Sequence, residues 1–276
     1  MFEGITLMIK LVLLLTFGFR KRFEKVGCWL RETYWNSLFI NLPAESERYI
    51  TAYVEGKIDQ REFWKYFTLL TGFAEPFINS LKLRFQPILE SIKDISLNKR
   101  EIHYYSDLKS YIEEKKIQEK ILLLQFRLRT TSRLDLKEWK HTLIEEIKVS
   151  EDSWQRSADK LLSEAKEIYP NIILCGGYLN SIKSYLKKPN NKIEFILLDD
   201  YWKSPLDILR TIIWKYGIEN IDEKKIELYL KLQKRYLDLV LTSKDIDEAH
   251  ETWTNMAKKP SITWKNISQE ISSITV

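Results

Sequence analysis

The chain has 276 residues, which is enough for one large domain or two small ones. Hydrophobic residues make up 44% of it and charged residues 30%, a composition that excludes a disordered protein. The net charge of +5 comes from 44 basic and 39 acidic residues whose signs alternate along helical segments. We therefore expect a solvated surface and no nucleic-acid-binding face.

Cysteine usage points to a reducing compartment. Cys28 and Cys175 are too far apart in sequence to suggest a disulfide framework or a metal site, so we expect a cytoplasmic protein. Only 8 glycines and 7 prolines occur, beside abundant Ile, Lys and Glu. This bias predicts long helices and is typical of a thermophile or of an AT-rich genome.

The N-terminal segment is apolar between Ile5 and Phe19, but Lys10 interrupts it. A helix needs about 20 apolar residues to span a bilayer, and this run is shorter. We therefore predict a buried strand at Lys10–Phe17 and no membrane span, with Met8 as an alternative start of the chain. A signal anchor over residues 5–19 is the competing interpretation.

The first half of the chain alternates strands with helices. Apolar residues at helical spacing over Arg20–Thr33 separate the first strand from a second at Ser37–Leu42, which predicts a βαβ unit. Asp59 and Glu62 have the spacing of a capping box. Further helices are expected at 46–54, 60–70 and 76–93, before a third strand at 102–105.

A second βαβ unit organises the rest of the chain. Ile172–Cys175 is an unbroken apolar strand, Gly176-Gly177 is a turn, and Ile193–Leu198 is another buried strand. Helices are expected at 108–149, with a break near 130, at 152–168, and then at 205–216, 222–242 and 246–256.

These elements predict an α/β fold with a mostly parallel sheet of four or five strands. A long helical insertion lies between strands three and four. We expect residues 8–105 and 170–276 to form the α/β core and residues 106–169 the insertion, together making one structural unit.

Ligands of open α/β sheets bind at the carboxyl ends of the strands, and this rule selects candidate residues. They are Thr16, Gly18 and Arg20 after the first strand, Glu45 after the second, Asp107 after the third, Gly176 and Gly177 after the fourth, and Asp199 and Asp200 after the fifth.

Two of these pairs carry specific hypotheses. Asp199 and Asp200 could bind a metal or act in acid–base chemistry. Neighbouring strand residues point to opposite faces, however, so one of them could instead cap the next helix. Gly176-Gly177 could cradle an anion at a helix N-terminus, or it could be a bare turn.

A basic patch lies between two of the predicted helices. Arg127 and Arg133 flank hydroxyl residues and could clamp a phosphate or a carboxylate. The alternative is a helix-end cluster that is paired with acidic neighbours. The three histidines are isolated in sequence; His250 is expected on a solvated helix, and no metal site or catalytic motif is found.

The order of these parts resembles the TraB/ChaN/erythromycin-esterase-like superfamily over roughly residues 8–200. The likeness rests on a Pro-Glu region at Leu42–Glu45, on Arg156 in a helix of the insertion, and on the late strand and turn of Ile172–Leu186. Family members place a histidine after the glycine of the first and late turns and use it in metal-dependent hydrolysis or haem binding. Phe19 and Tyr178 stand at these positions here. The resemblance thus implies a member with degenerate catalytic positions.

A second resemblance concerns Leu15–Phe19. This segment is similar to the start of CRISPR-associated Rossmann-like sensor domains, which bind cyclic oligonucleotides, and it implies a nucleotide sensor.

We therefore expect a protein that binds a small anionic ligand or a protein partner at the strand ends. The expected ligand-binding residues are Thr16, Gly18, Arg20, Arg127, Arg133, Arg156, Gly176 and Gly177. A metal-dependent hydrolase is the alternative, with Glu45, Asp199 and Asp200 as the candidate catalytic residues. The sequence indicates neither a cofactor nor an oligomeric state.

Overall fold

A computed structural model describes residues 9–15, 20–96, 100–166, 170–175, 179–198 and 203–258. The chain divides into two compact units, one of residues 1–113 and 149–199, the other of residues 114–148 and 200–276. The division differs from the ranges expected from the sequence, because the C-terminal helices group with part of the insertion and not with the sheet.

The first unit contains one sheet of five parallel strands in the order β3-β2-β4-β1-β5. The strands are β1 (Ile9–Leu15), β2 (Ser37–Pro43), β3 (Glu101–Ser106), β4 (Pro170–Cys175) and β5 (Asn191–Ile196). The predicted fold class, including the helical segment between β3 and β4, is confirmed.

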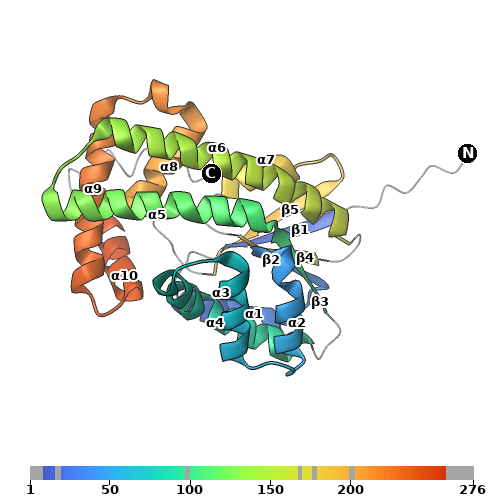
Figure 1. Ribbon diagram of the computed structural model, residues 1–276. Coiled ribbons are helices and arrows are strands. Elements are labelled where there is room, and N and C mark those ends of the chain that lie inside the picture. The colour runs from blue at the N-terminus through green and yellow to red at the C-terminus, as the bar shows by residue number, and fades with distance from the viewer. Residues whose placement is uncertain are drawn as a thin grey trace, which may run out of the picture. The chain divides into compact units, whose positions relative to one another are not determined.

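Helices cover both faces of this sheet (Figure 1). Strand β1 shows why: Leu11 and Leu13 belong to one core and Val12 and Leu14 to the other, and all four are buried. A strand buried on both faces reads as a continuous apolar run, and β1 has this pattern. The strand interpretation of the N-terminal segment therefore holds for Ile9–Leu15.

One face is covered by α1 (Arg20–Glu32), α2 (Glu47–Val54), α3 (Gln60–Thr71) and α4 (Glu75–Ser96), with the short η1 (Ala44–Ser46) before α2. The other face is covered by the last turns of α6 (Leu136–Glu164) and by α7 (Leu179–Leu186). Gly27 of α1 lets that helix approach α4 closely, since a Cβ there would lie 2.3 Å from the Ser91 hydroxyl oxygen.

The second unit is helical throughout its described part. It consists of the later part of α5 (Leu108–Thr131), the first part of α6, and α8 (Pro205–Tyr216), η2 (Ile218–Asn220), α9 (Glu223–Thr242) and α10 (Ile246–Lys258). Its largest fully buried side chains include Trp139, Tyr229 and Trp253.

The expected break near residue 130 is present, because α5 ends at Thr131. The expected start of a new helix at 152 is wrong, since α6 runs unbroken from Leu136 to Glu164. None of the described helices combines the length with the apolar character that a membrane-spanning segment requires.

Candidate functional site at the carboxyl edge of the sheet

The sheet opens at its carboxyl edge between β2 and β4. The ladder between these strands ends at the pair Phe39 and Ile173. Beyond it, β2 stays paired with β3 up to Pro43 and Ser106, and β4 stays paired with β1 up to Cys175. The two strands therefore separate over their last residues.

This opening coincides with a switch in strand order. After β2 the chain moves to β3, on one side, and after β4 it moves to β5, on the other. Connections that leave neighbouring strands in opposite directions form the crevice where open α/β sheets bind ligands. The Tyr105 side chain reaches from β3 to β4, and its hydroxyl donates a 2.8 Å hydrogen bond to the Leu174 carbonyl. This carbonyl lies beyond the last residue of β4 that pairs with β2.

On the β2–β3 side, polar side chains surround the start of α5. Asp107 caps this helix by accepting a 2.8 Å hydrogen bond from the Ser110 backbone N–H. Glu45 accepts one of 3.1 Å from the Leu108 N–H, so two carboxylates occupy the first donors of the helix. Arg156, from α6, donates to Asp107 at 3.3 Å and to the Ser110 hydroxyl at 2.5 Å.

The charge of Asp107 is stabilised by these contacts. Partial burial alone would raise the pKa of its carboxyl. Hydrogen bonds from the Ser110 hydroxyl and N–H, together with the Arg156 guanidinium, outweigh burial and hold the pKa below its usual value. Asp107 is therefore ionised at neutral pH and offsets the charge of Arg156.

Glu45 and Arg156 are both candidate site residues from the sequence and lie far apart in it. In the structure both contact one turn, residues 107–110. Their arrangement favours ligand groups that donate hydrogen bonds, such as hydroxyls and amines. An anion would find the helix N–H groups on this side already taken by carboxylates.

The β1 side of the edge has the opposite charge. Helix α1, which follows β1, begins with Arg20-Lys21-Arg22 and has no acidic residue in its first turn. Cations at a helix N-terminus oppose the helix dipole, and a bound anion would compensate both. Arg20 pairs with Glu24 at 3.0 Å, whereas exposed Lys21 has no partner among the residues that the structure describes.

Several expected site residues lie outside the described residues: Thr16, Gly18, Gly176, Gly177, Asp199 and Asp200. Their assigned roles stay predictions. Cys175, at the end of β4, is buried, and burial raises the pKa of its thiol far above neutrality, so it is not a thiolate nucleophile.

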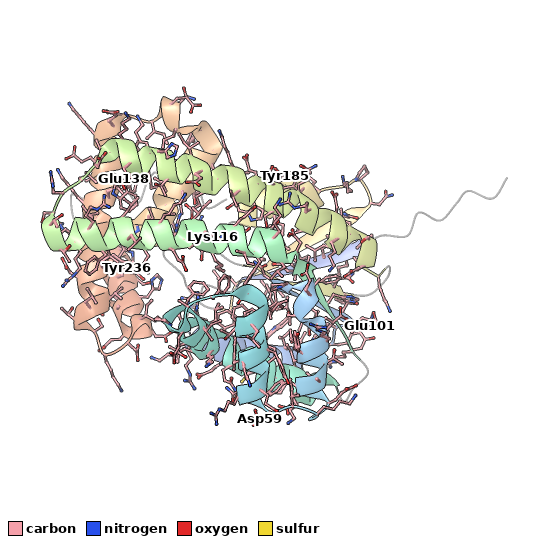
Figure 2. All side chains as sticks on the ribbon, viewed as in Figure 1. Asp59, Glu101, Lys116, Glu138, Tyr185 and Tyr236 are labelled. Carbon is pink, nitrogen blue, oxygen red and sulfur yellow. The ribbon has the colours of Figure 1, made fainter. Side chains whose placement is uncertain are left out.

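Arg127 and Arg133 belong to the second unit, where both line a half-open hollow of about 470 Å³. Glu138, in the first turn of α6 (Figure 2), also lines it and forms an ion pair with Arg127. Arg133 has no side-chain partner in the described ranges. The lining also includes Leu124 and Trp139, both buried. The lining holds two arginines and two carboxylates, those of Asp135 and Glu138, so its formal charge is zero.

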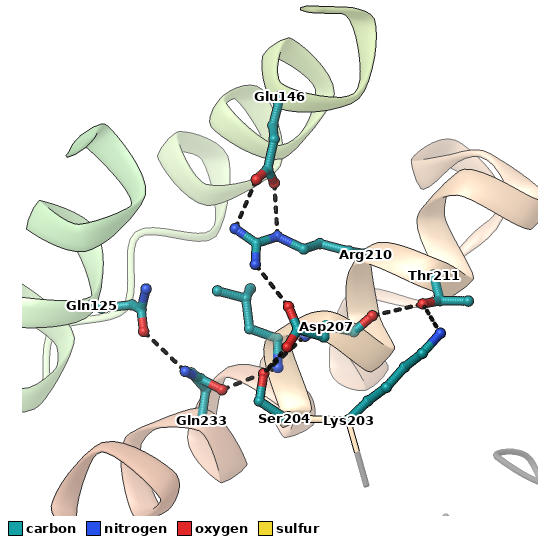
Figure 3. A network of polar contacts seen from close by, with 9 residues as sticks. Gln125, Glu146, Lys203, Ser204, Asp207, Arg210, Thr211 and Gln233 are labelled. Atoms are coloured by element: carbon teal, nitrogen blue, oxygen red, sulfur yellow. Dashed lines mark hydrogen bonds and ion pairs between the residues drawn. The ribbon is translucent and has the colours of Figure 1, made fainter. Parts of the chain in front are cut away.

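A buried polar network in the second unit was not foreseen (Figure 3). Glu146 of α6 receives two hydrogen bonds from Arg210 of α8, which also donates to Asp207 at 2.9 Å. Gln233 of α9 accepts from the Leu206 N–H and donates to Gln125 of α5. The one signal in the sequence was the position of Glu146 on the apolar stripe of its helix. The polar atoms satisfy one another, which identifies a structural network.

In the described part of the chain, no group of three or more His, Cys, Asp or Glu side chains has an arrangement that could hold a metal ion. His103 stacks on Phe39 and lies 3.3 Å from Glu164. The expectation that His250 is solvated is wrong: it is buried, 3.2 Å from the Tyr236 hydroxyl, because its face of α10 packs on α9.

No protein-family model, curated protein or solved structure matches the chain. The resemblances to the TraB/ChaN-like superfamily and to the CRISPR-associated sensors therefore stay predictions.

Proposed function

We propose that the carboxyl edge of the sheet binds a small anionic ligand that also carries hydrogen-bond donors. The observation that carries the proposal is the opening between β2 and β4 at the switch in strand order. The basic start of α1 lies to one side of it and the carboxylates of Glu45 and Asp107 to the other.

The spacing of the strands sets the size of the ligand. Strand β4 lies between β1 and β2, so their ends are separated by at least about 10 Å, which is two strand spacings, because β2 and β4 are no longer paired there. One molecule reaching both sides needs an anionic group near Arg20 and Lys21 and hydroxyl or amine groups near Glu45 and Asp107. A phosphorylated sugar or nucleoside has this combination.

We propose binding and not catalysis as the activity of this edge. Glu45 and Asp107 already accept hydrogen bonds from the backbone of α5, and Asp107 is also paired with Arg156. The pKa of Asp107 is lowered, whereas a general base at neutral pH needs a raised one.

Calorimetric titration with adenosine monophosphate, ribose 5-phosphate and inorganic phosphate tests the proposal. We expect the two organic phosphates to bind, and Lys21→Ala to weaken them roughly tenfold, as for loss of one charged hydrogen bond. Lys188→Ala is the matched control, because Lys188 is an exposed lysine just before β5, at the amino end of the sheet.

The carboxylate side is tested by Glu45→Gln. We expect this change to weaken the binding of ribose 5-phosphate. The binding of inorganic phosphate should not change, because this ion lacks the hydroxyl groups of a sugar. If none of the three probes binds, or if Lys188→Ala weakens binding as much as Lys21→Ala, the proposal is wrong.

A further inference from the structure

Among the residues that the structure describes, strand β5 is an open edge of the sheet, and we propose that it joins two copies of the chain into a dimer. The strand pairs with β1 on one side and with no described strand on the other, so the described sheet ends there. An unpaired strand edge offers a row of backbone donors and acceptors to another strand. The proposal is independent of the ligand proposed above.

The register shows which backbone groups face outward. The Ile9 N–H donates a 3.1 Å hydrogen bond to the Asn190 carbonyl. Since every second residue of a strand bonds to a given neighbour, Lys192 and Glu194 direct their backbone groups to β1. Ile193 and Phe195 turn theirs away, and no backbone group among the described residues pairs with them.

Side-chain exposure distinguishes the two edges of the sheet. At the β5 edge, Phe195 is 42% exposed and Leu197, just beyond the strand, 47%. At the β3 edge, Tyr104 and the two residues that follow it are buried. Natural proteins rarely leave apolar side chains on a strand edge that is open to solvent, because such edges associate. The exposed side chains of Phe195 and Leu197 therefore favour a covered edge in the native assembly.

The charges of β5 are complementary to a second β5 that runs antiparallel to it. A two-fold axis through Ile193 places Lys192 of each copy opposite Glu194 of the other, which gives two ion pairs across the junction. A two-fold axis through the next residue, Glu194, would instead place Glu194 of one copy opposite Glu194 of the other, and these like charges would repel. The opposite charges of Lys192 and Glu194 thus favour a second copy of this chain as the partner. They also favour the register with the two-fold axis through Ile193.

Both charged side chains are exposed enough to reach across. Lys192 is 55% and Glu194 35% exposed, and in one copy Glu194 already contacts Lys10 at 3.0 Å and Lys192 at 2.9 Å. In the dimer each Glu194 would gain a third lysine. The expected assembly is a continuous ten-stranded sheet that is parallel within each copy and antiparallel at the junction.

Sedimentation velocity of the full chain over a dilution series tests this inference. We expect a reversible monomer–dimer equilibrium, and we expect Phe195→Pro to give a monomer. Proline removes the outward N–H, whereas the bonds of Lys192 and Glu194 to β1 remain. Phe195→Thr, which keeps the N–H and a strand-forming side chain, is expected to dimerise more weakly. Circular dichroism of each variant verifies that it is folded.

Charge exchange tests the register. Lys192→Glu and Glu194→Lys should each weaken the dimer several-fold, because each places like charges opposite one another. The double variant restores complementary pairs and should recover affinity. A chain that is monomeric up to its solubility limit, or a dimer that Phe195→Pro leaves intact, overturns the proposal. Failure of the double variant to recover overturns this register.

Discussion

Arg210 donates two hydrogen bonds to the Glu146 carboxylate in the interior of the second unit, one of 2.8 Å from Nε and one of 2.7 Å from Nη2. Their side chains are only 13% and 7% exposed. Water therefore cannot replace a missing partner, and the pair behaves as one element of the helical core.

Removing one member of this pair should be costly. We expect Glu146→Ala to lower the free energy of unfolding by about 3–5 kcal/mol, because it leaves the Arg210 charge buried without its main partner. Urea denaturation measures the loss. Its matched control is Glu145→Ala, since the neighbouring Glu145 forms an exposed pair with Lys120 at 2.7 Å and should lose at most about 1 kcal/mol. Equal losses of stability at the two positions would show that the buried Glu146–Arg210 pair contributes no more than the exposed Glu145–Lys120 pair.

Asp107 should make stability depend on pH. Its folded-state pKa is lowered, so its contribution is complete above the unfolded pKa of about 3.9 and is lost as pH falls through the folded value. At neutral pH we expect Asp107→Ala to cost about 1 kcal/mol, as loss of a helix cap does. This cost should shrink as the pH is lowered below about 4.

Asp107→Asn separates capping from charge. Asparagine can still accept the Ser110 N–H but cannot pair electrostatically with Arg156, so this variant should lose less than the alanine variant at neutral pH. Denaturation midpoints measured between neutral and acidic pH provide the test. A cost of Asp107→Ala that is the same at every pH would show that the charge contributes nothing.

Gly27 should not tolerate a side chain. Alanine is the better helix former by about 1 kcal/mol, but its Cβ would lie 2.3 Å from the Ser91 hydroxyl oxygen, which Arg31 and the Pro87 carbonyl hold in place. We expect Gly27→Ala to destabilise the protein by about 1–3 kcal/mol through overpacking. Thermal denaturation of this variant gives the measurement.

The cause can be isolated with a double variant. Ser91→Ala removes the clashing oxygen, so Gly27→Ala should cost much less in the Ser91→Ala background than in the wild type. An unchanged cost there would mean that α1 and α4 are separated by some other contact, such as the Pro87 carbonyl at 3.3 Å.

Local chemistry in the sequence determined many of the elements. The spacing of Asp59 and Glu62 predicted a capping box, and both of its hydrogen bonds are present at the start of α3. The Ser204 side chain caps α8 by accepting a hydrogen bond from the Asp207 N–H, and Gly217 ends that helix with a φ of 75°, which glycine adopts without strain. These features depend on residues within one helical turn, so the sequence alone carries them.

The apolar runs likewise determined that the sheet is parallel and covered on both faces, because Leu11–Leu14 and Ile172–Cys175 have no polar side to offer to water. They did not determine the strand order. The insertion of β4 between β2 and β1, which creates the opening at the carboxyl edge, follows from packing over the whole unit.

The tertiary structure alone decided which charged groups meet. Glu45 lies 63 residues from Leu108 and Glu146 lies 64 residues from Arg210. Nothing in the spacing of such distant residues encodes their contact. Two charged residues that are three or four positions apart on a helix can pair because the helix repeat brings them together. Two charged residues that are far apart in sequence can pair only when the packing of apolar faces has brought their helices or strands together. The sequence by itself therefore determined the elements and the class of fold, and the packing of those elements decided the site.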